Sequence, residues 1–229
     1  MAMHFLITAG GTREYIDPVR FISNASSGRM GYALARAALK AGHRVTLITA
    51  TTALRPPAGA EIVRVESAAQ MFAAVKEHFP TCDCLIMAAA VADYTPAKPS
   101  KTKIKKDGGA SPTLQLKPTA DILKWAGRHK TGPRTAGHAP RIIVGFALED
   151  QNLRANAEQK MRDKRLDLIV ANPPTAINAE KSTVHIKTRD SQWVEIAAKS
   201  KTAIARRIVS LIERGEENER RGHRQTSRR

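Results

Sequence analysis

The sequence predicts an α/β fold built on a mostly parallel sheet, and three observations lead to that class. Short apolar runs alternate five times with segments whose apolar residues recur at helical spacing, which is typical of parallel strands linked by right-handed crossovers. The run at 83–90 is apolar after its first residue, as in a central strand covered on both faces. The segment 93–118 is instead rich in Lys, Pro, Gly and Ser. We therefore expect a Rossmann-like sheet with helices on both faces and a projecting two-stranded arm.

The first part of the chain supplies most of the parallel strands. A strand at 4–9 ends in Gly10-Gly11, and Ser26 or Ser27 can cap the helix that follows, which Gly42 ends. The next helix stops before Pro80, since proline cannot continue it. We expect strands at 4–9, 44–49, 61–65 and 83–90, and helices at 28–41 and 68–78.

The second part of the chain begins with the arm, whose alternating pieces at 102–105 and 113–117 predict its two strands. Thr119 or Asp121 then caps a short helix that reaches about Arg128. A polar loop at 129–140 precedes the remaining elements. We expect strands at 141–147 and 166–171, helices at 150–164 and 199–214, and a hairpin formed by 184–188 and 193–196. Residues 1–214 then form a single domain, and the Arg-rich residues 215–229 form a disordered basic tail.

Composition excludes several classes of protein. The chain has 229 residues, enough for one large domain, and 42% of them are hydrophobic, as in ordinary globular proteins. No apolar run reaches about 18 residues, and the N-terminus lacks the features of a secretory signal. We therefore expect a cytoplasmic protein that does not enter a membrane. Cys82 and Cys84 should point to the same face of a strand as small core residues, since no other cysteine completes a metal site.

The formal net charge of +17 has several interpretations. It could indicate nucleic-acid binding, a polyanionic small substrate, or a basic proteome. Aromatic residues make up only 4% of the chain, which argues against a platform for stacking the bases of single strands. Charge alone does not decide among these classes.

The predicted fold indicates where a ligand should bind. In open parallel sheets, ligands bind beyond the carboxyl ends of the strands. The loops after Ala9, Ala90 and Ala147 should therefore line the site, and they have the most unusual sequences in the chain.

The first of these loops combines glycines with small polar residues. Gly10 and Gly11 allow a tight turn and close approach to a ligand. The stretch that contains Asn24, Ser26, Ser27 and Gly28 precedes a helix, whose free N–H groups favour an anion. The pattern matches neither G-x-G-x-x-G nor a P-loop. Helix capping and tight packing by the glycines is the structural alternative, but the unusual length of the loop favours function.

The other candidate residues also have structural alternatives. Small residues at 88–90 would leave room for the flat ring of a nucleotide base. Asp93 could accept hydrogen bonds from ribose hydroxyls or simply open a turn. Lys103 and Lys105 share one strand face, with Ile104 opposite, so they could bind phosphate or form a solvated edge. Two further lysines lie on one face of a helix end, where cations are favourable in any case, at positions Lys160 and Lys164.

Taken together, these stretches resemble phosphopantothenoylcysteine synthetase, the coenzyme A pathway domain often fused behind a flavin-dependent decarboxylase. They occur in the same order and span most of residues 4–197. The matching stretches are TAGGTREYIDPVRFISNASSGRMG, AAAVADYTP, KIKK, LQLKPTADIL, VGFALE and KMRDKRLDLIVAN. The resemblance implies a Rossmann-like homodimer in which the arm contributes to dimerisation.

The resemblance also implies a two-step reaction and a set of site residues. The carboxylate of 4′-phosphopantothenate attacks the α-phosphate of CTP, or of ATP in the eukaryotic branch, with Mg²⁺ present. L-cysteine then attacks the acyl-nucleotide and forms the amide. By position, Asn24 matches the asparagine that handles the acyl-nucleotide, and KIKK with the spaced lysine pair is similar to the CTP-using branch. The other matched positions are Ala89 for the base, Asp93 for the ribose, Phe146 for the nucleotide pocket, and Lys103, Lys160 and Lys164 for the triphosphate.

Two other classes of function predict features that differ from those of this chain. An NAD(P)-dependent reductase of similar topology predicts a G-x-G-x-x-G/A turn, which the first loop lacks. A nucleic-acid-binding protein predicts lysines spread along one surface and strongly salt-dependent affinity; we expect no nucleic acid as a partner. Met1 lies only a few residues before the first strand, so we expect neither a fused decarboxylase nor a flavin.

Overall fold

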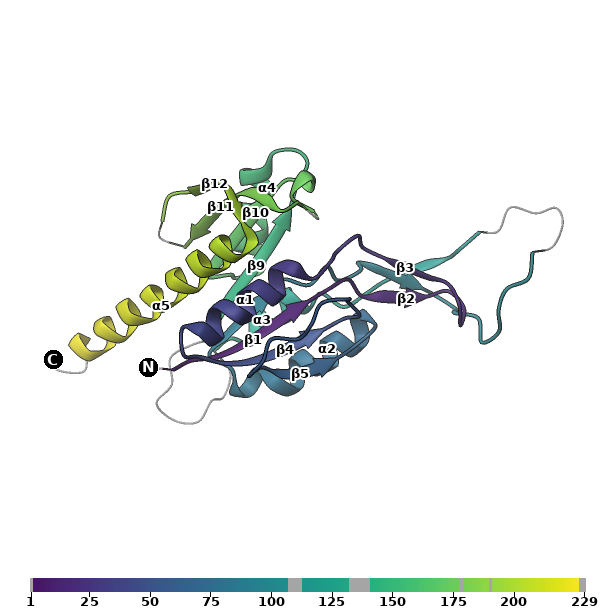
Figure 1. Cartoon of the computed structure of the whole chain (residues 1–229), viewed down its shortest axis with the longest axis horizontal. Coiled ribbons are helices and arrows are strands. Elements are labelled where there is room, and N and C mark those ends of the chain that lie inside the picture. The colour runs from purple at the N-terminus through teal and green to yellow at the C-terminus, as the bar shows by residue number, and fades with distance from the viewer. Residues whose placement is uncertain (1, 107–112, 132–140, 178, 190, 227–229) are drawn as a thin grey trace.

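An eight-stranded sheet forms the centre of the computed structural model, which describes residues 2–106, 113–131, 141–177, 179–189 and 191–226 (Figure 1). The strand order is β12-β11-β10-β9-β6-β1-β4-β5, with neighbours parallel from β10 to β5 and antiparallel from β10 to β12. The strands are β1 (His4–Ala9), β4 (Arg44–Thr49), β5 (Glu61–Arg64), β6 (Cys84–Met87), β9 (Ile142–Leu148), β10 (Leu168–Asn172), β11 (Lys181–Thr188) and β12 (Val194–Ser200). The predicted fold class is confirmed.

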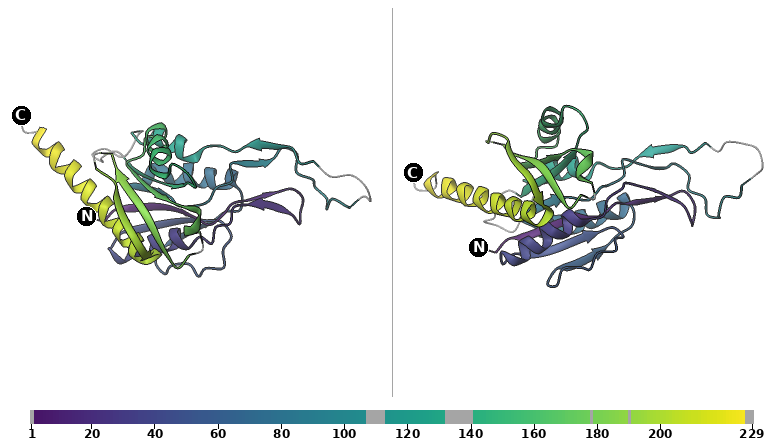
Figure 2. Two further views of the ribbon diagram at one scale, coloured as in Figure 1. Left: turned by 90° about the horizontal axis from the view of Figure 1, so that it is seen from above. Right: turned by 45° about the horizontal axis from the view of Figure 1, so that its top comes forward.

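Helices cover both faces of the sheet. The helices are α1 (Arg29–Lys40), α2 (Ala68–His78), α3 (Ile122–His129), α4 (Leu153–Asp163) and α5 (Lys201–Thr226), with short 3₁₀ turns at Phe79–Thr81 and Pro174–Ala176. α1 and α5 pack side by side on one face, as Figure 2 shows, and α2, α3 and α4 pack on the other. This arrangement gives the sheet two apolar layers.

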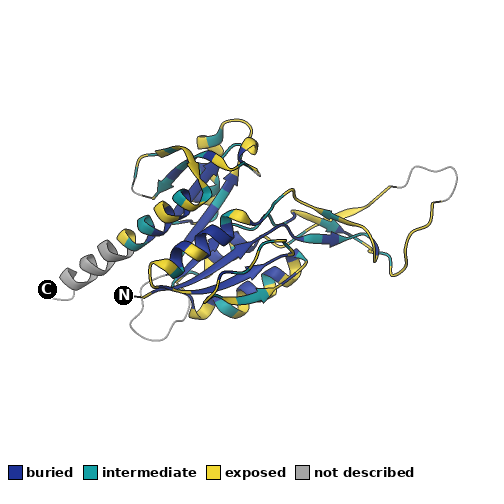
Figure 3. Ribbon diagram, viewed as in Figure 1, coloured by how far each residue is buried: buried dark blue, intermediate teal, exposed yellow. Residues whose placement is uncertain are grey.

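Successive side chains along each strand point alternately into the two apolar layers. In β1, Phe5 and Ile7 face the layer of α1 and α5, whereas Leu6 faces the layer of α2, α3 and α4. All three side chains are fully buried, and Figure 3 shows buried residues running the length of the central strands. The described residues contain no helix long and apolar enough to cross a bilayer.

The arm consists of two hairpins that lie side by side at the carboxyl end of the sheet (Figures 1 and 2). One pairs β2 (Arg13–Tyr15) with β3 (Phe21–Ser23) inside the first loop, where no strand was predicted. The other pairs β7 (Tyr94–Pro96) with β8 (Leu116–Pro118). The arm is therefore larger than the predicted 93–118 segment.

The predicted strand at 102–105 is wrong. The amide of Ile104 donates to Asp17 Oδ2 at 3.2 Å, and its carbonyl oxygen accepts from Arg20 at 2.7 Å. The backbone of this segment is therefore held by the turn of the first hairpin and not by a ladder, so Lys103 and Lys105 do not share a strand face.

Two predicted local features at the helix α1 and β6 boundaries are also corrected. Neither Ser26 nor Ser27 caps α1. Its N-cap is Gly28, with φ of 75° and no side-chain cap, and Ser26 Oγ accepts a hydrogen bond from the Gly28 amide instead.

Cys82 and Cys84 are buried as predicted but belong to opposite apolar layers, because Cys82 precedes β6 and its thiol donates to the Phe79 carbonyl oxygen. Strand alternation does not apply across that boundary.

The predicted disorder after residue 214 is corrected too, because α5 continues to Thr226. Glu, Arg and Gln dominate this stretch and are good helix formers, so lack of apolar periodicity did not end the helix. The predicted polar loop at 129–140 falls largely outside the described residues.

Candidate active site

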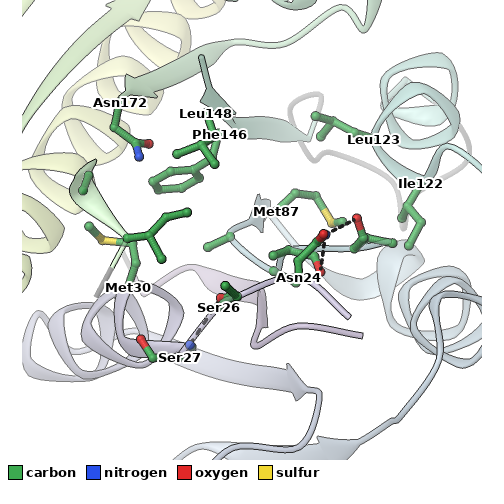
Figure 4. A pocket seen from close by; sticks show the side chains of 18 of the residues that line it. Asn24, Ser26, Ser27, Met30, Met87, Ile122, Leu123, Phe146, Leu148 and Asn172 are labelled. Carbon is green, nitrogen blue, oxygen red and sulfur yellow. Dashed lines mark hydrogen bonds between the residues drawn. The ribbon is translucent and has the colours of Figure 1, made fainter. Parts of the chain in front are cut away.

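A cavity of about 740 Å³ opens at the carboxyl ends of β6, β9 and β10 (Figure 4), a volume typical of small-molecule sites. The loops after Ala9 and Ala90 contribute to it, as the sequence predicted, whereas after Ala147 only Leu148, the last residue of β9, lines it and the loop beyond does not. It is lined by residues 24–30, 87–91 and 119–123 together with Asp93, Phe146, Leu148, Lys160, Lys164, Asn172, Ala176, Ile177, Ser182, Val184 and Lys201.

Glycines let the Asn24–Gly28 loop lie directly on the end of β1. A Cβ on Gly11 would meet the Asn24 carbonyl oxygen at 2.7 Å, and one on Gly28 would meet the Gly10 amide nitrogen at 3.2 Å. Gly10 and Gly28 also have φ of 83° and 75°, which disfavours any side chain there. Gly10 and Gly11 therefore support the cavity from beneath and do not line it.

Asn24 joins two of the three loops. Its Nδ2 donates to the carbonyl oxygens of Ala90 at 3.3 Å and Val91 at 3.1 Å (Figure 4). These bonds hold the loop after β1 against the loop after β6. In this arrangement both amide N–H groups point at the backbone, so Asn24 must exchange one of the bonds to donate to a ligand.

The floor of the cavity is formed by Ala88, Ala89 and Ala90, which leave the sheet just after β6 ends. Ala89 donates its amide to Thr8 Oγ1 at 3.1 Å, and Ala90 donates to the Gly10 carbonyl oxygen at 2.9 Å. Methyl side chains on a fixed backbone make a shallow surface. Phe146, Leu148 and Asn172 stand at neighbouring strand ends across from Met30 and Ser26 (Figure 4).

Two lysines of the α4 end line the cavity near α3. Lys164 Nζ lies 3.0 Å from Asp121 Oδ2, and Asp121 also caps α3 by accepting from the Lys124 amide at 2.9 Å. Burial lowers the pKa of Lys160, and the nearby Lys164 lowers it further, against the opposing charges of Glu149, Asp121 and Asp93. Two close cations in a partly buried site favour a polyanionic ligand.

Close packing of α3 against the residues that follow α4 fixes the position of Lys164. A Cβ at Gly127 would overlap the Lys164 carbonyl oxygen, so only glycine permits this approach. The backbone that carries Lys164 is therefore positioned by a residue remote from the cavity.

The structure brings together most of the predicted site residues. Those that line the cavity are Asn24, Ser26, Ser27, Gly28, Ala89, Asp93, Phe146, Lys160 and Lys164. Lys103 does not line it; this residue is exposed on the arm next to Ile104. In the described structure, Lys103 therefore lies outside the cavity of its own chain.

Sequence reasoning missed Asn172, Ser182 and Lys201 as cavity residues. The rule that ligands bind at strand ends could have found Asn172, the last residue of β10. Ser182 and Lys201 had no such signal, because they lie near the start of β11 and α5 and come together only through the antiparallel pairing of β11 with β12.

Comparison with known proteins decides the family. Residues 1–215 match the family model described as DNA/pantothenate metabolism flavoprotein C-terminal domain. The chain belongs to this family. It is 44% identical over 217 residues to the coenzyme A biosynthesis bifunctional protein CoaBC of Mycobacterium bovis, covering 90% of this chain and 51% of that protein. The CoaBC protein of Bacillus subtilis is 44% identical over 214 residues, with 91% and 50% covered.

A solved structure of the DNA/pantothenate metabolism flavoprotein family supports the same grouping. The crystal structure of the C-terminal domain of a CoaBC protein is 38% identical, with a TM-score of 0.78, and the match covers 94% of this chain and 96% of that one. The chain spans about half the length of the curated relatives it matches.

Proposed function

We propose that this chain is a phosphopantothenate–cysteine ligase of coenzyme A biosynthesis, which joins 4′-phosphopantothenate to L-cysteine through an acyl-nucleotide, with CTP as the preferred co-substrate. One observation carries the proposal: a single cavity combines a shallow alanine floor, a pair of lysines and an amide side chain at the carboxyl ends of a parallel sheet. The family and the names of its CoaBC members support it.

Activation by a nucleotide follows from the chemistry of amide formation. A carboxylate does not react with an amine at neutral pH, because it is a poor electrophile with no leaving group. Attack of the carboxylate oxygen on the α-phosphorus expels pyrophosphate and leaves an acyl-cytidylate. The cysteine nitrogen then attacks the acyl carbon, CMP leaves, and the amine loses a proton. The protein chiefly positions reactants and stabilises charge.

The cavity residues divide between the nucleotide and the reacting carboxylate. Ala88–Ala90 would support the base, and Asp93 would accept hydrogen bonds from the ribose hydroxyls. Lys160 and Lys164 would neutralise the phosphates, with Lys164 exchanging its ion pair with Asp121 for a phosphate oxygen. Asn24 would donate to the acyl oxygen after releasing one carbonyl of the neighbouring loop.

Mg²⁺ suits this site as a companion of the triphosphate. No group of three or more His, Cys, Asp or Glu residues that could hold a metal occurs in the described part of the chain. Mg²⁺ commonly takes only one or two carboxylates and completes its shell with phosphate oxygens and water. Asp93 and Asp121 are the cavity carboxylates that would hold it, and the ion would supply positive charge to the phosphates.

A homodimer would explain the position of Lys103 and the apolar side chains of the arm. Val19, Phe21, Tyr94 and Leu116 are 58%, 40%, 55% and 45% exposed. We propose that a second copy of the chain covers this surface, named here the arm surface. An exposed Lys103 on a projecting arm could then reach the cavity of the other subunit.

Turnover of phosphopantothenate and L-cysteine with CTP and with ATP tests the proposed function. We expect equimolar pyrophosphate and amide product, with a higher kcat/KM for CTP. NADPH serves as the comparison ligand in a thermal-shift measurement. Stabilisation by NADPH but not by either triphosphate, together with no amide product, would reject the ligase in favour of a reductase.

Asn24→Ala tests the role of the amide side chain. Removal of a single oxyanion donor commonly lowers the rate by about 10²–10³-fold. We expect the variant to release pyrophosphate and accumulate the acyl-nucleotide, with the second step slowed. Product formation at the wild-type rate by a folded variant would contradict the assignment.

A further inference from the structure

Thr12 lies behind the contact that Asn24 makes with the loop after β6. It is the residue between the Gly10-Gly11 turn and β2, and it is fully buried. It is not among the residues that line the cavity. Any effect of Thr12 on a bound ligand must therefore pass through the residues that it holds.

All three polar groups of Thr12 form hydrogen bonds to the segments that meet at Asn24. Its amide donates to the Ala90 carbonyl oxygen at 3.3 Å, and its Oγ1 accepts from the Ala92 amide at 2.9 Å. Its carbonyl oxygen accepts from Ser23 Oγ at 2.8 Å, and Ser23 directly precedes Asn24. Thr12 thus holds both the segment that carries the Asn24 amide and the loop that accepts from it.

The Oγ1 of Thr12 is one of two threonine hydroxyls that fix Ala92. Thr119 Oγ1 donates to the Ala92 carbonyl oxygen at 2.6 Å, and the Thr119 amide donates to the Asp93 carbonyl oxygen at 2.9 Å. Ala92 is buried, and a buried peptide group that loses its partner is unfavourable. Without the Thr12 hydroxyl, the Ala92 amide would lose its acceptor and the loop would have to move to satisfy it.

The two acceptors of Asn24 differ in what else holds them. Asn24 Nδ2 donates to the Val91 carbonyl oxygen at 3.1 Å and to the Ala90 carbonyl oxygen at 3.3 Å (Figure 4). The Ala90 oxygen also accepts from the Thr12 amide, so it keeps a partner when Asn24 releases it. Release of Ala90 is therefore the less costly exchange, and it leaves Asn24 anchored on Val91 with one N–H free.

We propose that Thr12 is a positioning residue of the reaction: it anchors the loop after β6 so that Asn24 releases Ala90, stays on Val91 and directs its free N–H at the acyl oxygen of the acyl-nucleotide. This inference rests on the proposed function and deepens the part that Asn24 has in it. Small displacements of an orienting group lower rates strongly, by about 100-fold for about 1 Å. A buried residue behind Asn24 therefore governs the second step of the reaction without touching the substrate.

Thr12→Val is the main test, because it removes the hydroxyl and retains the branched shape. We expect the conversion of acyl-nucleotide to amide to slow by about 10- to 100-fold, with the acyl-nucleotide accumulating. The KM for CTP should change by less than about threefold, because the residues that contact the nucleotide remain. Thr12→Ser retains the Oγ and should restore the second step to within about threefold of the wild type.

Ser23→Ala is a milder variant, since Ser23 is exposed and its substitution removes only the bond to the Thr12 carbonyl oxygen and its weaker contact with Asn24. We expect its second step to slow by about 3- to 10-fold, as for the loss of one hydrogen bond. A wild-type second step in Thr12→Val, or in Ser23→Ala if Thr12→Val does not fold, overturns the proposal.

A double-mutant cycle separates positioning from a general loss of structure. In the Asn24→Ala background, Thr12→Val should slow the second step by less than about twofold, because the amide that Thr12 orients is gone. Independent effects would multiply, and a further loss of about 10-fold or more in the double variant overturns the proposal. Thr46→Val is the matched control, because it removes another fully buried threonine hydroxyl, on β4 and outside the cavity lining. It should lower the melting temperature and leave the second step unchanged.

The side-chain amide signals of Asn24 report the same contact without turnover. In an NMR spectrum they are the pair that disappears in Asn24→Ala. They should shift in Thr12→Val, return in Thr12→Ser and stay in place in Thr46→Val. Unshifted signals in Thr12→Val overturn the proposal. If these signals shift but the wild type forms no amide with any nucleotide, the hold of Thr12 on Asn24 stands and the ligase assignment fails.

Discussion

Lys160 should give nucleotide binding a characteristic pH dependence. Its pKa lies below the ordinary 10.5, chiefly because of burial and then because of Lys164. The protonated form binds phosphate, so affinity is full at neutral pH and falls as pH rises through the lowered pKa. We expect CTP affinity to decline at a pH below 10.5, and Lys160→Met to bind weakly with a flatter profile.

Isothermal titration calorimetry from about neutral pH upward checks this dependence. Lys40→Met is the matched control, because Lys40 is exposed at the far end of α1. A wild-type affinity that stays constant until the ordinary lysine pKa would show that Lys160 does not govern the nucleotide.

Gly127 is the residue whose substitution should most disturb the cavity from a distance. An added Cβ would overlap the Lys164 carbonyl oxygen, so Gly127→Ala must push α3 away from the backbone that follows α4. We expect the free energy of unfolding to fall by about 1–3 kcal/mol, as for other overpacked sites, and CTP affinity to fall with it.

Urea denaturation measures this loss, and Gly215→Ala is the control. A Cβ at Gly215 meets nothing within 4 Å inside α5, so alanine should be neutral or slightly stabilising there. Equal stability of the two variants would contradict the proposed role of the contact between Gly127 and Lys164.

The two hairpins of the arm are tied together through Asp17. Burial alone would raise the pKa of its carboxyl, but hydrogen bonds from Val19, Arg20 and Ile104 outweigh that effect and hold the pKa well below 3.8. A carboxyl with a lowered pKa contributes its stabilisation above the unfolded value and loses it as pH falls through the lowered value. The hydrogen bonds to the Asp17 carboxylate should therefore persist at about pH 4 and be lost only in stronger acid.

Asp17→Asn should loosen this tie at every pH. The amide retains its size but loses the charge that attracts Arg20 and the Ile104 amide. We expect faster hydrogen exchange at Ile104 in the variant and no acid-dependent change in its amide signal. Glu77→Gln on the exposed side of α2 is the control. Wild-type exchange in Asp17→Asn would show that other contacts hold the arm.

The molecule as a whole presents an apolar arm that a second copy should cover. Val19→Ser combined with Leu116→Ser removes two exposed apolar side chains from the arm surface. We expect sedimentation analysis to show dissociation to monomers and turnover to fall with it, because Lys103 would no longer reach the other subunit. Val194→Ser, on β12 away from the arm, should remain dimeric. A wild-type monomer with full turnover would reject the dimer.

Local patterns in the chain were sufficient for the strands and helices of the central sheet and for most of the cavity. Apolar periodicity depends on neighbouring residues, so it located β1, β4, α2 and the helix–strand alternation within a few residues. Parallel strands bring their carboxyl ends to one edge, which is why the loops holding Asn24 and Asp93 could be expected to meet the end of β9 at Phe146.

Contacts between distant segments decided the rest. Tyr94 pairs with Pro118, and Asp17 accepts a hydrogen bond from the Ile104 amide. Neither contact follows from a local sequence period. The strands of the arm and the position of Lys103 were therefore predicted wrongly or not at all. Ser182 and Lys201 begin a strand and a helix far along the chain. Only the antiparallel edge of the folded sheet brings them together at the cavity, because Ser182 pairs with Lys199 of β12 and Lys201 directly follows that strand.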